Sequence, residues 1–78
     1  MPRYFFHIYH ERPQLDDVGE ELPDKHGAWE EATKTAGQIL QGLDGRLKPE
    51  HDWRMEVVDE SQAPLYVLRI RAEKPTQD

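Results

Sequence analysis

The sequence contains no cysteine, which excludes disulfide bridges and thiolate metal sites. It also has no continuous apolar run of about 18 residues, the minimum for a membrane-spanning helix. No basic segment followed by an apolar stretch opens the chain, so no export signal is expected. A glycine-rich phosphate loop is missing as well, and no cofactor is predicted. We therefore expect a cytoplasmic protein that does not enter the membrane.

Positive charge is also scarce. Ten Lys and Arg residues against sixteen Asp and Glu residues give a net charge of −6, which opposes non-specific binding to nucleic acid or anionic lipid. The only serine, Ser61, lies in a predicted turn and lacks the flanking glycines of a nucleophile elbow. Acid–base catalysis by two carboxylates needs a cleft, for which so small a protein has little room. We assign no catalytic residue and expect a protein that is not an enzyme.

The 78 residues can form only one hydrophobic core, and hence one domain. We place this domain at residues 1–72. Residues 73–78 carry charges and a proline but no apolar anchor, so they are predicted to form a disordered tail.

The first half of the chain predicts a strand, a turn and a short second strand. Residues 3–9 alternate, with Tyr4, Phe6 and Ile8 on one side and the other aromatic residues and His7 on the opposite side. An acidic turn with proline and glycine follows, and a short strand is predicted near residues 17–22.

A single amphipathic helix is predicted next. Asp24 is placed to cap its first turn, because its carboxylate can accept a bond from a free backbone N–H. Gly42 and Gly45 are the expected positions for a left-handed end, and Gly37 inside the helix predicts a close contact. The residues that face the sheet recur at helical spacing: Ala28, Ala32, Ala36, Ile39 and Leu43, flanked by Trp29 and Leu40.

Two further alternating runs, residues 53–59 and 65–72, predict an antiparallel hairpin. Ser61 and Gln62 lie at its tip, where a two-residue turn would prefer glycine or asparagine, so we expect a four-residue loop built on a type I turn. If the apolar residues share the core face, Val57 pairs with Tyr66, Met55 with Leu68 and Trp53 with Ile70.

These elements together predict an α+β fold of two layers, with one helix packed on a small antiparallel sheet. The order along the chain is strand, short strand, helix, strand, strand.

Several separated segments resemble one family. They are residues 2–7 (PRYFFH), residues 17–24 (DVGEELPD), Ala28 and Ala32, and residues 53–57 (WRMEV) before Asp59 and Glu60. In this order they resemble a family of short, uncharacterised proteins, common in rhizobia and related alphaproteobacteria, that is grouped as a domain of unknown function. The family has no established reaction, so the resemblance implies no site residues. Its members often have glycine in the last hairpin turn. Ser61 and Gln62 in that place require a left-handed residue other than glycine, or a different loop.

Two groups of residues raise the question of metal binding, and a solvated surface is the better interpretation of both. The four histidines, His7, His10, His26 and His51, lack the spacing of a metal site. The acidic turn has oxygen ligands that suit calcium but not the spacing of an EF-hand loop. It consists of Asp16, Asp17, Glu20, Glu21 and Asp24. We predict no metal site.

One helix can cover only one face of the sheet, and the composition of the other face favours contact with another chain. We expect this open face to be an interface, most simply that of a homodimer, in a small interaction or regulatory module. The alternative is a nucleic-acid-binding or antitoxin-like regulator, in which bases stack on the aromatic rings and arginines hold phosphates. The predicted interface residues are Phe5, His7, Tyr9, Arg54, Val58, Leu65, Val67, Arg69 and Arg71, with Glu56 among them.

Overall fold

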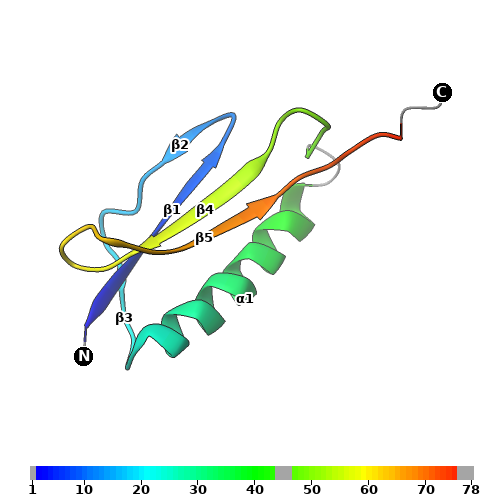
Figure 1. Cartoon of the computed structure of the whole chain (residues 1–78). Coiled ribbons are helices and arrows are strands. Elements are labelled where there is room, and N and C mark those ends of the chain that lie inside the picture. Colours follow the sequence, from blue (N-terminus) through cyan, green and yellow to red (C-terminus); the bar gives the residue numbers. More distant parts are fainter. Residues whose placement is uncertain (1, 44–46, 76–78) are drawn as a thin grey trace.

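The computed structural model describes residues 2–43 and 47–75. One helix packs on one face of an antiparallel sheet, which gives a two-layer α+β fold (Figure 1). This confirms the predicted fold class and the position of the helix before the last hairpin. The elements are β1 (Arg3–His10), β2 (Arg12–Gln14), β3 (Glu20–Glu21), α1 (Lys25–Leu43), β4 (Trp53–Val58) and β5 (Pro64–Ile70).

The strands lie in the order β2-β1-β4-β5, and β3 also pairs with β1. β3 is the short strand that the sequence predicts. β2 was not predicted, and it pairs with the end of β1 through Ile8 opposite Gln14 and His10 opposite Arg12. Between β2 and β3 the chain leaves the ladder over residues 15–19. The sheet thus has one edge formed by two short strands and another edge formed by β5 alone.

The helix begins after Asp24, whose carboxylate accepts a hydrogen bond from the Gly27 backbone N–H at 2.9 Å, as expected for a capping residue. Three alanines, Ala28, Ala32 and Ala36, are buried against the sheet and let the two layers approach closely. The predicted left-handed end at Gly42 is wrong, because the helix continues through this residue to Leu43.

Two smaller expectations for the helix have different outcomes. A Cβ at Gly37 would meet no atom within 4 Å, so the close contact predicted there is also wrong. Gly45, the other predicted helix end, lies outside the described residues.

The hairpin of β4 and β5 has the predicted register. Met55 lies opposite Leu68, with Trp53 opposite Ile70 and Val57 opposite Tyr66. The loop is shorter than the expected four residues. The Asp59 N–H donates to the Ala63 carbonyl at 3.1 Å, so only residues 60–62 lie between these two hydrogen-bonded residues. Gln62 takes the left-handed conformation, with φ of 66°.

A β-bulge next to this loop corrects the predicted place of Leu65. Val58 pairs with Pro64 while its neighbour Val57 pairs with Tyr66, so Leu65 is an extra residue on β5. Its side chain packs against the core cluster and is not part of the open face. A bulge interrupts the alternation of side chains from which we had placed this residue.

The tail is described only in part. Residues 73–75 contain no helix or strand. Residues 76–78 lie outside the described part of the chain, so the predicted disorder there stays a prediction.

Candidate protein-interaction surface

The apolar layer between helix and sheet is closed over β4 and half open over β5. On β4, Trp53 is 1% exposed, and Met55 and Val57 are fully buried. Their partners on β5, Tyr66 and Leu68 among them, face the same layer but remain partly exposed. Phe6 and Ile8 on β1 are partly exposed as well, but β1 is flanked by β2 and β3, whereas β5 is an edge strand. The helix therefore leaves an apolar strip along a free edge of the sheet only at β5.

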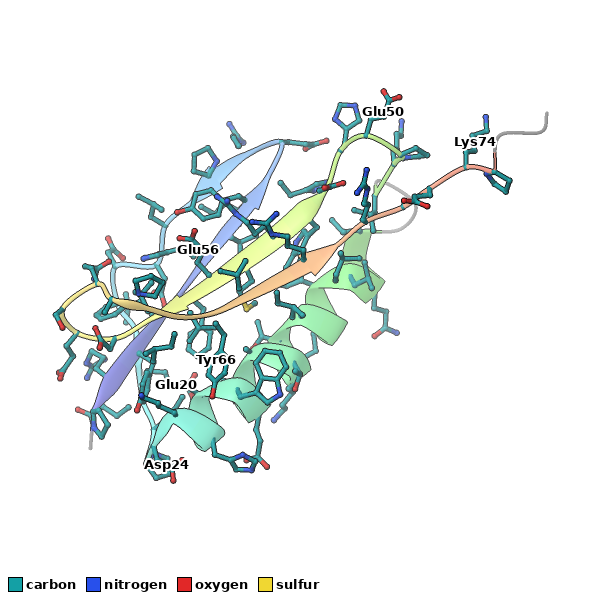
Figure 2. All side chains as sticks on the ribbon, viewed as in Figure 1. Glu20, Asp24, Glu50, Glu56, Tyr66 and Lys74 are labelled. Atoms are coloured by element: carbon teal, nitrogen blue, oxygen red, sulfur yellow. The ribbon has the colours of Figure 1, made fainter. Side chains whose placement is uncertain are left out.

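The helix flank beside β5 extends this strip. The rings of Trp29 and Tyr66 lie 5.0 Å apart with a tilt of 40°, so Trp29 marks the side of the helix that looks toward β5. Figure 2 shows Tyr66 pointing from β5 toward the helix. Leu40 lies three turns after Trp29 on the same flank and is 38% exposed. The sequence predicted only that both residues flank the helix residues that face the sheet, and neither was assigned to an interaction surface.

The opposite face of the sheet holds most of the predicted interface residues. His7 pairs with Glu56 and Tyr9 with Arg54 between β1 and β4, and these pairs lie on the face away from the helix. Glu56 can be seen on this face in Figure 2. Phe5, Val58, Val67 and Arg69 join them through the same registers, while Arg71 lies just beyond the end of β5.

One end of this face is not open. Val58 is 4% exposed and His7 is buried, so neither presents a free surface. A Cβ at Gly19 would come within 2.8 Å of the Phe5 ring, which shows that the loop of residues 15–19 lies on Phe5. Gly19 has φ of 76°, a conformation that glycine adopts without strain. The exposed part of the face is thus limited to the region around Val67 and the arginines.

Asp16 holds that loop in place. Its carboxylate accepts hydrogen bonds from the backbone N–H groups of Phe6 at 3.1 Å, Val18 at 3.1 Å and Gly19 at 3.0 Å. Burial raises the pKa of this carboxyl, but these three hydrogen bonds, together with the charge of the His7 ring when it is protonated, lower it by more, so the pKa lies below 3.8. From the sequence, only an acidic turn was expected here.

His7 connects the loop to the hairpin tip. Its Nδ1 accepts a hydrogen bond from the Asp16 backbone N–H at 3.0 Å, so the neutral ring carries its proton on Nε2. Nε2 faces the Gln62 side-chain oxygen at 3.4 Å. His7 therefore has a structural role. The sequence alone could not predict this role, because it depends on the position of the loop of residues 15–19.

The other end of the face carries a basic and aromatic cluster. The Arg54 guanidinium lies 4.3 Å from the centre of the Tyr9 ring, a cation–π contact. Arg69 lies opposite Arg54 on β5. With Asp52 these residues line a shallow hollow of about 250 Å³. Glu56 approaches Arg54 to 3.9 Å, and the Arg54 Nε is buried with no hydrogen-bond partner in the described chain.

Among the described residues, the remaining histidine and acidic side chains form no cluster. His10 lies on the helix side and lines a hollow with Ile39 and Trp53, and His26 is 3.3 Å from Glu30 on the exposed helix surface. Within residues 2–43 and 47–75, no group of three or more His, Asp or Glu side chains could hold a metal ion.

Comparison with known proteins identifies the family. The family described as "Domain of unknown function (DUF6894)" matches residues 3–71, nearly the whole chain. The chain belongs to this family. No curated protein and no solved structure gives a significant match. Among the described residues, no helix has the length and apolar character needed to cross a membrane.

Proposed function

We propose that this member of DUF6894 is a small, non-enzymatic interaction module that works by protein–protein contact and associates first with itself. One observation carries the proposal: β5 is a free edge strand whose helix-side residues are only partly covered, whereas the helix-side residues of β4 are fully buried. Removing such apolar surface from water favours association by about 25 cal/mol per Å². Since the uncovered strip lies along an edge, a second chain can cover it.

The β5 edge adds a second attraction. An edge strand presents backbone N–H and C=O groups without partners, and proteins that stay monomeric usually protect such strands with charges, prolines or bulges. On β5 the bulge and Pro64 lie only at the beginning. From Tyr66 to Ile70 the strand is regular, with Arg69 as its one charged residue. This edge therefore suits strand addition.

The open face contributes less than we expected from the sequence. With Val58 buried and Leu65 in the core layer, Val67, at 46% exposed, is its main free aliphatic residue. We therefore place the interface at the β5 edge, with Val67 and Arg69 beside it. A cytoplasmic location remains our proposal and rests on the lack of cysteine.

Sedimentation at micromolar concentration tests this function. The unmodified protein should sediment as a dimer, and Val67→Lys should shift it toward monomer. The variant should remain folded, because the new cation would lie beside Glu56 within its own sheet. Val18→Lys is the matched control, since Val18 is 70% exposed on the loop of residues 15–19 and far along the sheet from β5. A protein that stays monomeric throughout this range would refute self-association.

The basic and aromatic cluster favours a second candidate, binding of single-stranded nucleic acid. Tyr9 could stack on a base while Arg54 and Arg69 hold a phosphate. The Asp52 carboxylate and the net charge of −6 act against it. Fluorescence anisotropy with a labelled single-stranded oligonucleotide separates the two functions. Binding that falls steeply with salt and is lost in Arg69→Ala would support this candidate, whereas an apolar protein interface should be nearly insensitive to salt.

A further inference from the structure

The direction of the backbone groups on β5 follows from β1. The Phe6 N–H is hydrogen-bonded on the side of β1 that faces away from β4. Backbone groups of successive residues in a strand point to opposite sides, and the alternation continues across an antiparallel ladder. Met55 and Leu68 therefore exchange hydrogen bonds within the hairpin. The N–H and C=O groups of Val67 and Arg69 consequently project outward from the β5 edge.

Building on the proposed self-association, we propose that two copies join β5 to β5 in antiparallel fashion about a twofold axis at Leu68, which makes one continuous sheet. Leu68 then lies opposite the second copy's Leu68. Val67 lies opposite the second copy's Arg69, and these two residues exchange the backbone hydrogen bonds that the edge leaves unmade. A twofold contact of this kind closes on itself and gives a dimer and no larger assembly.

The apolar pattern of β5 is symmetric about Leu68. Tyr66 and Ile70 lie two residues before and after it, and all three side chains face the helix layer. The proposed register therefore sets Tyr66 against the second copy's Ile70 and matches every partly exposed residue of the strip with an apolar partner. A twofold axis at Val67 would instead leave Ile70 opposite Pro64.

Charge selects the same register. Val67 separates Glu56 on β4 from the position that the second copy's Arg69 would occupy, and a valine is small enough for the arginine to reach across to the carboxylate. Arg69 has no ion pair among the described side chains. An axis at Val67 would place the Glu56 side chains of both copies around a pair of valines, and an axis at Arg69 would set two arginines directly opposite each other, which is unfavourable.

The helices fit this arrangement. Trp29 and Leu40 lie on the helix flank that looks toward β5, and the twofold axis brings the same flank of the second copy beside it. The strip left open by one helix is thereby enclosed by two. The second copy is the one occupant that supplies the strand, the arginine and the apolar helix flank together.

A charge exchange tests the register. Val67→Lys would face the second copy's Arg69, and Arg69→Glu would face the second copy's Val67 next to Glu56. Each should raise the dimer dissociation constant roughly tenfold, since each unfavourable pair occurs twice in a twofold dimer. In the double variant, the lysine introduced at position 67 faces the glutamate introduced at position 69 of the second copy, so the dissociation constant should return to within a few-fold of the original. Within one copy both changes are favourable, because residue 67 lies beside Glu56 and residue 69 beside Arg54.

A single introduced cysteine gives an independent reading, since the chain has none of its own. In the proposed register the two copies of Leu68→Cys have Cα atoms about 4.5 Å apart and should form a disulfide-linked dimer rapidly with oxidised glutathione. Val67→Cys lies diagonally, about 7 to 8 Å from its counterpart, and should link far more slowly.

The outcomes separate the two proposals. A dimer that the double variant fails to restore, or in which Val67→Cys links faster than Leu68→Cys, would overturn the register and leave self-association standing. A monomeric protein would overturn both. Because Val67 and Arg69 are exposed, the charge variants decide the matter even if Leu68→Cys folds poorly.

Discussion

Removing the Asp16 carboxylate should loosen the edge of the sheet between β2 and β3. In Asp16→Ala, the backbone N–H groups of Phe6, Val18 and Gly19 all lose their acceptor. A net contribution of about 0.5 to 1.5 kcal/mol per hydrogen bond gives a loss of roughly 1.5 to 4.5 kcal/mol. We expect about 2 to 3 kcal/mol, because water can replace the bond to the exposed Val18 segment more easily than the bond to Phe6.

Asp16→Asn separates these bonds. Val18 and Gly19 donate to Oδ1, which the amide oxygen can replace, whereas Phe6 donates to Oδ2, where the amide nitrogen would meet another donor. The expected loss is about 1 to 2 kcal/mol. For a domain of 78 residues, each kcal/mol lowers the melting temperature by about 4 to 8 °C. Urea denaturation measures both variants, with Asp17→Asn as the matched control, since Asp17 is exposed and adjacent.

The lowered pKa of Asp16 determines how its contribution to the free energy of unfolding changes with pH. Its pKa is lower in the folded protein than the ordinary 3.8, so the unfolded chain takes up a proton first as the pH falls. The stability that the ionised carboxylate contributes is therefore complete well above pH 3.8 and is lost as the pH falls through the folded pKa. The difference in unfolding free energy between the unmodified protein and Asp16→Asn should shrink in this acidic range. An equal loss in Asp17→Asn, or a difference that widens in acid, would refute the assignment.

Two further changes test the packing of the helix. Ala32 is fully buried against the sheet, so Ala32→Leu should overpack the layer and cost roughly 1 to 3 kcal/mol in urea denaturation, while Thr33→Leu on the exposed side should change stability little. Gly37 is exposed with free space around it, so Gly37→Ala should raise the melting temperature by a few degrees, corresponding to about 0.5 to 1 kcal/mol. Unchanged stability in Ala32→Leu, or a lower melting temperature in Gly37→Ala, would contradict these assignments.

The sequence predicted the elements whose side chains repeat over many residues. Met55 and Leu68 belong to long alternating runs in which a shift by one residue would expose the whole apolar set, so their pairing was predictable. The helix had both a cap at Asp24 and a continuous alanine stripe. Its end was not predictable from Gly42, because glycine is tolerated inside a helix at modest cost.

The short and irregular parts could not be derived in the same way. β2 has three exposed residues, one of them Pro13, and therefore shows neither alternation nor strand composition. The bulge that turns Leu65 into the core depends on how the ladder meets the loop, which alternation alone does not reveal. Alternation likewise assigned His7 to a face correctly but could not show that the loop held by Asp16 covers it.

These errors in the sequence analysis bear directly on where we place the proposed interface. An alternating pattern predicts which face of the sheet a side chain occupies. Whether that side chain is buried depends on which other segments of the chain cover the face. Here the loop of residues 15–19 covers one end of the open face, while the single helix leaves the β5 side of its own layer incomplete. A chain this short has little other apolar surface with which to complete that layer. If a second copy supplies the missing cover, association adds to the stability of each fold by mass action. The same strip that the helix fails to close then links folding to assembly.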